Sequence, residues 1–129
     1  MPRRSTGVYP SNWDEIATAV KEAAGWRCVR CQHPHAPGVG RCLTVHHLDM
    51  NPANNRWFNT VALCQRCHLT IQGKVKMAQA YLYEHSEWFK PYVAGFYAFT
   101  VLGRDLTREE VDACTDYLLS AGQPWLVSA

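Results

Sequence analysis

Two Cys-x-x-Cys pairs constrain the fold of this 129-residue chain more than any other feature. Cys28 and Cys31 form the first pair, Cys64 and Cys67 form the second, and 32 residues lie between them. Pairs with this internal spacing are typical of zinc knuckles, in which four thiolates surround one ion as a tetrahedron. The spacing therefore predicts a closed structural Zn²⁺ site that ties two distant segments together.

A disulfide framework is the other interpretation of six cysteines in a short chain. Such frameworks normally accompany a secretory signal and irregular cysteine spacing. The basic N-terminal segment has no apolar stretch behind it, so we expect a cytoplasmic protein with reduced thiols. Cys42 and Cys114 fall outside the pairs, and we interpret them as buried or half-buried small apolar side chains.

Three histidines and an asparagine lie between and beside the cysteine pairs. His46 and His47 are adjacent, Asn59 follows, and His68 comes directly after Cys67. Imidazoles beside an amide suit an open site that holds water and a phosphate, unlike a closed thiolate cage. Adjacent residues at a strand end point to opposite sides, so one histidine of the doublet can face a metal ion while the other faces water. The chain thus carries ligands for two metal ions with different roles.

Local patterns indicate a small α+β core. Asn12 and Glu15 are spaced like a capping box, and apolar residues then recur at helical intervals until Gly25. Strands are expected at 42–46 and 60–63, a turn-rich loop at 49–59, another loop at 32–40, and a helix from Gln65 to about Glu84 with a break near Gly73.

The remainder of the chain is rich in aromatic residues and has no pattern of metal ligands. Thr107 and Glu110 predict a capping box at the start of a last helix that closes near Gly122. We therefore divide the chain into residues 1–84, whose core motif spans 28–74, and residues 85–129. The second part is expected to be a helical, acidic extension that packs on the core or forms an interface.

Charge is distributed unevenly along the chain. Residues 1–76 carry ten basic and four acidic side chains, whereas residues 77–129 carry three basic and seven acidic ones. The half that holds the metal motifs would therefore attract a polyanion such as DNA. The longest nearly uncharged apolar stretch, residues 91–103, is too short to span a bilayer, so we expect no membrane insertion.

Taken together, these residues resemble the HNH endonucleases, especially the small zinc-knuckle members found in phages and bacteria. The resemblance covers residues 28–74 and is carried by Cys28-x-x-Cys31, His46-His47-x-Asp49 and Asn59-x-x-x-Leu63-Cys64-x-x-Cys67-His68. It implies the family's ββα-metal fold, which is called treble-clef-like when the cysteines are present. It also implies a metal-dependent hydrolase that cuts DNA phosphodiester bonds and leaves 5′-phosphate and 3′-hydroxyl ends.

The resemblance also implies a role for each matching position. His47 would be the general base that activates water, and Asn59 would orient it by tying the loop between the strands. His46 and His68 would hold the catalytic divalent ion. The role of Asp49 stays open between orienting the site and capping a turn. Structural Zn²⁺ would be bound by Cys28, Cys31, Cys64 and Cys67, and the candidate phosphate contacts are Arg56, Arg66 and Lys74.

The chain departs from the family pattern in one respect that concerns the catalytic ion. Many members offer a further ligand shortly after the third histidine, whereas Thr70, Ile71, Gln72 and Gly73 follow it here. Two protein imidazoles would hold an ion loosely and leave it rich in water. That arrangement favours Mg²⁺ or Mn²⁺ in use, with Ni²⁺ or Zn²⁺ as alternatives.

Several alternatives stay open. The histidines could all be structural in a non-catalytic zinc module that binds DNA or supports assembly. His33 or His35, beside the first cysteine pair, could replace a cysteine at the structural site. The acidic, aromatic extension could recruit a protein such as the phage DNA-packaging enzymes with which small phage members are associated. The sequence leaves the oligomeric state undetermined.

Overall fold

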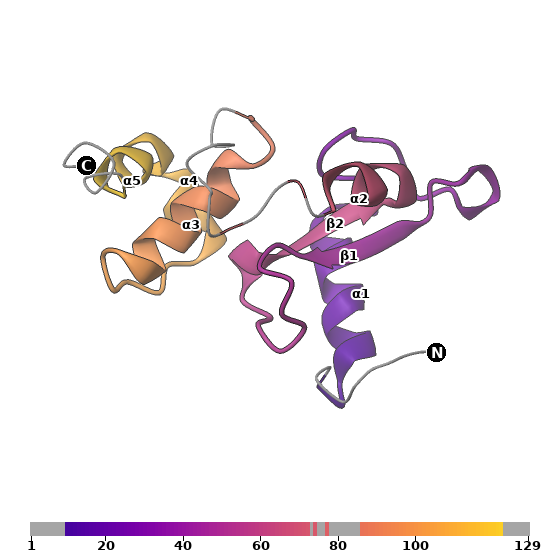
Figure 1. Ribbon diagram of the computed structural model, residues 1–129, viewed down its shortest axis with the longest axis horizontal. Coiled ribbons are helices and arrows are strands. Elements are labelled where there is room, and N and C mark those ends of the chain that lie inside the picture. The colour runs from indigo at the N-terminus through magenta and orange to yellow at the C-terminus, as the bar shows by residue number, and fades with distance from the viewer. Residues whose placement is uncertain (1–9, 73, 75–76, 78–85, 123–129) are drawn as a thin grey trace. The chain divides into compact units, whose positions relative to one another are not determined.

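A computed structural model describes residues 10–72, 74, 77 and 86–122 of the chain. The chain forms two compact units, Met1–Lys74 and Val75–Ala129. The first is a mixed α/β unit with a two-stranded antiparallel sheet, and the described part of the second is helical (Figure 1). The division falls before the boundary expected at residue 84, and that position lies outside the described residues.

Helix α1 (Trp13–Ala23) begins the described part of the first unit. The capping box predicted for Asn12 is wrong, because its side chain makes no capping hydrogen bond. Its backbone has φ −100° and ψ 29°, outside the extended region that a side-chain cap needs. Its backbone carbonyl instead accepts from Glu15 N at 3.1 Å. After α1, Gly25 adopts a φ of +68°, which glycine tolerates without strain, and the chain turns toward the first cysteine pair.

Strands β1 (Leu43–His47) and β2 (Thr60–Cys64) form the antiparallel sheet, each within one residue of the predicted bounds. Leu43 pairs with Cys64 at one end of the sheet, and His47 pairs with Thr60 at the other. Every residue of β2 is buried. The register therefore places the histidine doublet at the end of β1 that is remote from Cys64, the cysteine of β2.

Helix α2 (Gln65–Ile71) follows β2 without a connecting loop. It ends where Gln72 turns to a ψ of 125°, just before the break expected near Gly73. The predicted continuation to about Glu84 lies almost entirely outside the described residues. Both predicted loops contain a short 3₁₀ helix, η1 (Pro37–Val39) in the first and η2 (Trp57–Asn59) in the second.

Helices α1 and α2 both pack against the two strands. His47 contacts Trp13 of α1, whereas its neighbour His46 contacts His68 of α2. Because successive strand residues point to opposite faces, the two helices cover opposite faces of the sheet (Figure 1). The core between these layers is small; its largest fully or nearly fully buried side chains include Leu43, Leu48, Phe58, Val61, Leu63 and Ile71.

The second unit contains α3 (Lys90–Thr100), α4 (Arg108–Asp112) and α5 (Thr115–Ala121), and α3 packs against both of the others. The capping box predicted for Thr107 and Glu110 is confirmed. The prediction of one last helix is wrong, because Cys114 has a φ of −146° and separates α4 from α5. Its thiol donates to Glu110 O and the Thr115 hydroxyl donates to Val111 O, so local side-chain bonds accompany the break.

The aromatic segment supplies the core of the second unit. Phe89, Tyr92 and Tyr97 are at most 5% exposed. Gly122, which follows α5, lies so close to the Tyr97 ring that a Cβ atom there would overlap it. Cys42 and Cys114 are half-buried, as expected for cysteines outside the metal-binding pairs. Within the described ranges, no helix has both the length and the apolar character that crossing a membrane requires.

Candidate metal centre and histidine cluster

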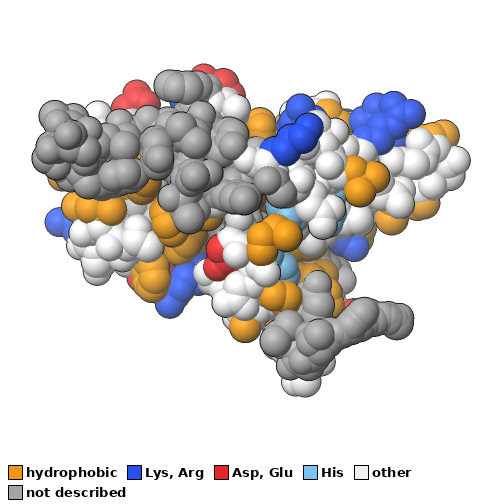
Figure 2. Space-filling view, viewed as in Figure 1, with side chains coloured by type: hydrophobic (Ala, Val, Ile, Leu, Met, Phe, Trp, Pro, Cys, Tyr) orange, Lys and Arg blue, Asp and Glu red, His pale blue; other side chains and the backbone are white. Residues whose placement is uncertain are grey.

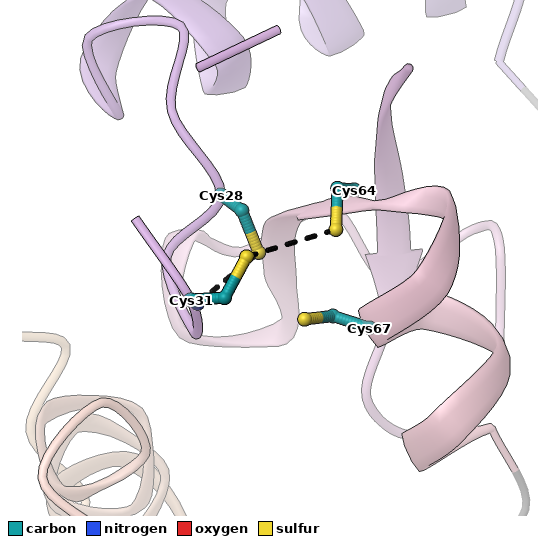
Figure 3. Close-up of side chains that lie close together, drawn as sticks. All are labelled: Cys28, Cys31, Cys64 and Cys67. Atoms are coloured by element: carbon teal, nitrogen blue, oxygen red, sulfur yellow. Dashed lines mark hydrogen bonds between the residues drawn. The ribbon is translucent and has the colours of Figure 1, made fainter. Parts of the chain in front are cut away.

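The two Cys-x-x-Cys pairs converge on one point, as their spacing predicted (Figure 3). The four Sγ atoms lie within 4.8 Å of one another, and those of Cys31 and Cys64 are 3.8 Å apart. A tetrahedral zinc ion with bonds of about 2.3 Å separates its sulfur ligands by about 3.8 Å. The four cysteines therefore fit a structural zinc ion.

Local backbone geometry brings each pair together. In the first pair, Cys31 N donates to Cys28 Sγ at 3.4 Å, and Gln32 follows with a φ of +66° that closes the turn. In the second pair, Cys64 precedes α2 in an extended conformation, and Cys67 lies on the first turn of that helix. A backbone hydrogen bond from Val29 N to Ala62 O joins the first turn to β2. Three of the four cysteines are buried, and Cys31 is exposed.

Two arginines donate hydrogen bonds to the sulfur cluster. Arg30 Nη1 lies 3.3 Å from Cys67 Sγ, and Arg41 Nη1 lies 3.4 Å from Cys31 Sγ and 3.7 Å from Cys64 Sγ. Four thiolates around one zinc ion carry a formal excess of negative charge, which the guanidinium groups offset. The sequence reasoning missed both residues, although Arg30 lies inside the first Cys-x-x-Cys pair.

The pKa values of the two thiols in the second pair are shifted in opposite directions. Burial tends to raise the pKa of Cys64, but hydrogen bonds from the Cys67 backbone and from Arg41 outweigh it and lower the pKa to about 6. At Cys67 burial prevails over the hydrogen bond from Arg30, and the pKa is raised. Because metals bind the thiolate, the lowered pKa makes Cys64 a ready ligand near neutral pH.

On the α2 face of the sheet, two histidines meet through their ring nitrogens. His46 Nδ1 lies 3.1 Å from His68 Nε2. The other nitrogen of His68, Nδ1, lies 2.8 Å from Thr44 Oγ1, and this hydroxyl donates its own proton to Leu63 O at 2.7 Å. The Thr44 oxygen must therefore accept from Nδ1–H, which leaves the lone pair of a neutral His68 on Nε2, facing His46.

The separation of the two nitrogens is compatible with two ligands of one divalent ion. An octahedral ion with bonds of about 2.1 Å separates adjacent ligands by about 3.0 Å, close to the 3.1 Å between the nitrogens. Burial, then the neighbouring His68 and His47, lower the pKa of His46 to about 4, and burial lowers the pKa of His68. Both rings are thus neutral at neutral pH, the form that binds metals.

The histidine pair is less complete than the cysteine cluster. Across the described residues, the four cysteines are the only group of three or more His, Cys, Asp or Glu side chains placed to share an ion. His68 donates its Nδ1–H to the Thr44 hydroxyl, and metal-binding histidines usually donate the N–H of the nitrogen that does not bind the ion. His46 Nε2 is buried with no hydrogen-bond partner in the described part of the chain. The pair alone would hold an ion loosely.

On the α1 face of the sheet, His47 contacts an aromatic ring and an amide. Its ring centroid lies 5.1 Å from that of Trp13, with 32° between the planes. Its Nε2 atom lies 2.8 Å from Asn55 Oδ1. His47 is buried, with 6% of the residue exposed. The doublet is therefore divided between two environments, as strand geometry requires.

Asn59 ties the loop between the strands, as expected, but the contact with His47 comes from Asn55. Asn59 Nδ2 donates to Asp49 Oδ1 and to Asn54 O, each at 2.8 Å, and its Oδ1 accepts from Asp49 N at 2.9 Å. Asp49 also accepts from Asn51 N and Asn54 Nδ2, so its role is to hold the loop. Nothing in the spacing of these residues distinguished Asn55.

Thr44 and Trp13 are the other contacts that sequence reasoning missed. Thr44 lies two residues before His46 and therefore on the same face of the strand, a signal that was available. Trp13 gave no signal, because a helical apolar residue usually belongs to a core. The three candidate phosphate contacts, Arg56, Arg66 and Lys74, are all exposed. Figure 2 shows basic side chains and imidazole surface on the same face of the first unit.

Neither histidine beside the first knuckle replaces a cysteine. His35 Nδ1 accepts a hydrogen bond from Leu43 N at 2.9 Å, at the start of β1. His33 Nδ1 lies 2.7 Å from Pro34 O. Neither residue joins the group of candidate metal ligands, so both have local structural contacts instead.

Comparison of the chain with protein-family models, with curated proteins and with solved structures finds no match in any of the three. Its function is therefore inferred from the site itself.

Proposed function

We propose that the chain is a metal-dependent endonuclease of the HNH type that hydrolyses DNA phosphodiester bonds. The observation that carries this proposal is the division of the histidine doublet. His46 joins His68 in a pair of nitrogen donors, while His47 is held separately by Asn55. A hydrolase needs one group that binds a metal ion and a second that accepts a proton from water, and the doublet can supply both.

The reaction assigned to the site is the attack of water on a DNA phosphate. His47 takes a proton from the water, the water oxygen bonds to phosphorus, and the bond from phosphorus to the 3′ oxygen breaks. The departing oxygen takes a proton from solvent water, which leaves a 3′-hydroxyl and a 5′-phosphate. A divalent ion at His46 and His68 would stabilise the negative charge that develops on the phosphate and the leaving oxygen.

Other features support the same proposal. The order β1, β2, α2, with one cysteine pair before the sheet and the other at its end, is the order of a treble-clef-like ββα-metal unit. Two imidazole ligands are compatible with Mg²⁺ or Mn²⁺, which keep several waters when bound. Exposed basic residues on the first unit provide charge for DNA phosphates; the candidates are Arg56, Arg66 and Lys74.

The test is plasmid cleavage by the 129-residue chain, with EDTA and then Mg²⁺, Mn²⁺, Ni²⁺ or Zn²⁺ added. His47→Ala should lower the cutting rate by a factor of about 100 or more, the usual contribution of a general base. His33→Ala is the matched control, because within the described residues the His33 ring contacts only the neighbouring carbonyl of Pro34. This variant should cut DNA at the wild-type rate. No cutting by the zinc-loaded wild type with any of these metals would overturn the proposal.

A second candidate is a non-catalytic zinc module that binds DNA. The low exposure of His46 and His47, 4% and 6%, favours it, because a reacting water and a phosphate need access to the doublet. Under this alternative, His47→Ala would leave DNA binding and zinc content unchanged, and no metal would support cutting by the wild type. Cutting that depends on His47 would exclude it.

A further inference from the structure

We infer that Asn55 is the positioning residue for His47: its side-chain oxygen accepts the Nε2–H proton of the imidazole and fixes the orientation of the ring. The contact is the 2.8 Å separation of His47 Nε2 and Asn55 Oδ1. The catalytic consequence rests on the proposed function, whereas the hydrogen bond itself can be tested without it.

The direction of this hydrogen bond follows from the second contact of the amide. Asn55 Nδ2 donates to Pro52 O at 3.1 Å, which places the amide nitrogen toward the loop backbone. The oxygen then faces His47. An amide oxygen carries no hydrogen, so Nε2 of His47 must be the donor. In a neutral imidazole the lone pair is then on Nδ1, so Nδ1 is the nitrogen that can take up a proton.

The loop holds Asn55 in place through the asparagine network next to it. Asn59 binds both Asp49 and the carbonyl of Asn54, the residue directly before Asn55. Asn54 Nδ2 in turn donates to Asp49 Oδ2 at 2.8 Å. Asn59 therefore orients His47 only indirectly. It holds the loop, and Asn55 of that loop contacts the imidazole.

Trp13 restricts the ring from another direction. The two ring centroids are 5.1 Å apart, so the imidazole lies close to the indole as well as to the amide. Rotation of the imidazole by half a turn would replace Nε2 with a carbon atom opposite Asn55 Oδ1 and break the hydrogen bond. When His47 accepts a proton, the bond becomes charge-assisted and stronger, so Asn55 also stabilises the cation formed in the proposed reaction.

The experiment compares the zinc-loaded wild-type chain of 129 residues with Asn55→Leu, Asn55→Asp and Asn51→Ala by NMR of ¹⁵N-labelled histidine. Leucine removes the acceptor, whereas aspartate keeps an oxygen there. Asn51→Ala is the matched control, because the Asn51 side chain belongs to the same loop and its oxygen accepts from Ala53 N, while Asn55 stays in place. Spectra are recorded at about pH 8.5, where model imidazoles are neutral.

The wild type, Asn55→Asp and Asn51→Ala should show His47 protonated at Nε2, with a proton protected from exchange with water. Asn55→Leu should lose this protected proton while keeping its zinc and its other histidine signals. A wild-type His47 protonated at Nδ1, or a protected Nε2 proton that persists in Asn55→Leu, would overturn the inference.

Cutting assays separate this inference from the proposed function. Asn55→Leu should lower kcat by about 10- to 100-fold with little change in KM, by analogy with the loss of a partner that orients a metal-binding histidine. Asn55→Asp should recover much of the loss. A wild type that shows the protected proton but cuts no DNA would refute the nuclease and leave the positioning contact intact, whereas normal cutting by Asn55→Leu would refute the positioning role alone.

Discussion

The cysteine cluster (Cys28, Cys31, Cys64 and Cys67) and the histidine cluster (His46, His47 and His68) each take one side chain from α2 but are built in opposite ways. The cysteine cluster gathers four equivalent ligands around one point and adds two arginines to their sulfurs. The histidine cluster takes two adjacent residues and sends them to different faces of the sheet. The comparison shows that the convergence of the cysteines follows from their spacing in the sequence, whereas the contacts of each histidine depend on the loop and the helices around the sheet.

Breaking the cysteine cluster should have the largest effect, because it removes both sites. Cys64→Ser should release the zinc and unfold the first unit. A structural zinc ion in a small module contributes about 10–16 kcal/mol of binding free energy. That is as large as the whole stability of a typical domain, about 5–15 kcal/mol. Thermal melting followed by circular dichroism, with zinc content measured in parallel, checks this expectation.

Cys114→Ser is the matched control for that experiment. Its thiol is half-buried and donates to Glu110 O, which a serine hydroxyl can also do. This variant should keep one zinc ion and nearly the melting behaviour of the wild type. A near-native melt for Cys64→Ser would show that the fold does not depend on the cluster.

Lowering the pH should distinguish the two clusters, because His46 belongs to the histidine cluster and its protonation destabilises the folded state. Burial and the adjacent His68 and His47 lower the pKa of His46 from 6.5 to about 4 in the folded state. Between these pH values the unfolded chain binds a proton at His46 and the folded chain does not. Stability from this residue is therefore complete above pH 6.5 and falls as the pH drops toward 4, by about 2–3 kcal/mol.

Urea unfolding between those pH values, with bound zinc measured at each point, tests this sign. His46→Gln should show a smaller decline than the wild type, because it lacks the titrating group. The ring protons of His46 should titrate near pH 4 in the absence of an added divalent ion. Titration at the ordinary histidine value, or an equal decline in both proteins, would contradict the burial argument.

The smallest predicted effect concerns the arginines on the sulfur cluster. Arg41→Met removes the hydrogen bonds to Cys31 and Cys64 but leaves all four ligands. Zinc transfer to a chelator should become several-fold faster, with the fold retained. Arg27→Met is the control, because Arg27 donates to the exposed carbonyl of Gln32 and not to sulfur. Equal release rates for the two variants would show that Arg41 does not protect the ion.

The two clusters also differ in how far the sequence could predict them. The four cysteines and both strands followed from spacing and from apolar patterns, because these features are local and repeated. Asn55, Trp13 and Arg41 could not be predicted, since each reaches its partner through a loop or across helix packing. The break at Cys114 could not be predicted from the sequence either, because the apolar residues on both sides of it keep the spacing of one continuous helix.

The register of the sheet gives the cysteine cluster a further consequence. Arg41, two residues before β1, donates hydrogen bonds to the sulfurs of Cys31 and Cys64, and Leu43 pairs with Cys64 in the sheet. A slip of one residue between the strands would exchange the two histidines, turning His47 toward α2 and His46 toward α1. By holding the start of β1 against the end of β2, the sulfur cluster fixes the register of the two strands. It thereby determines which imidazole faces which helix.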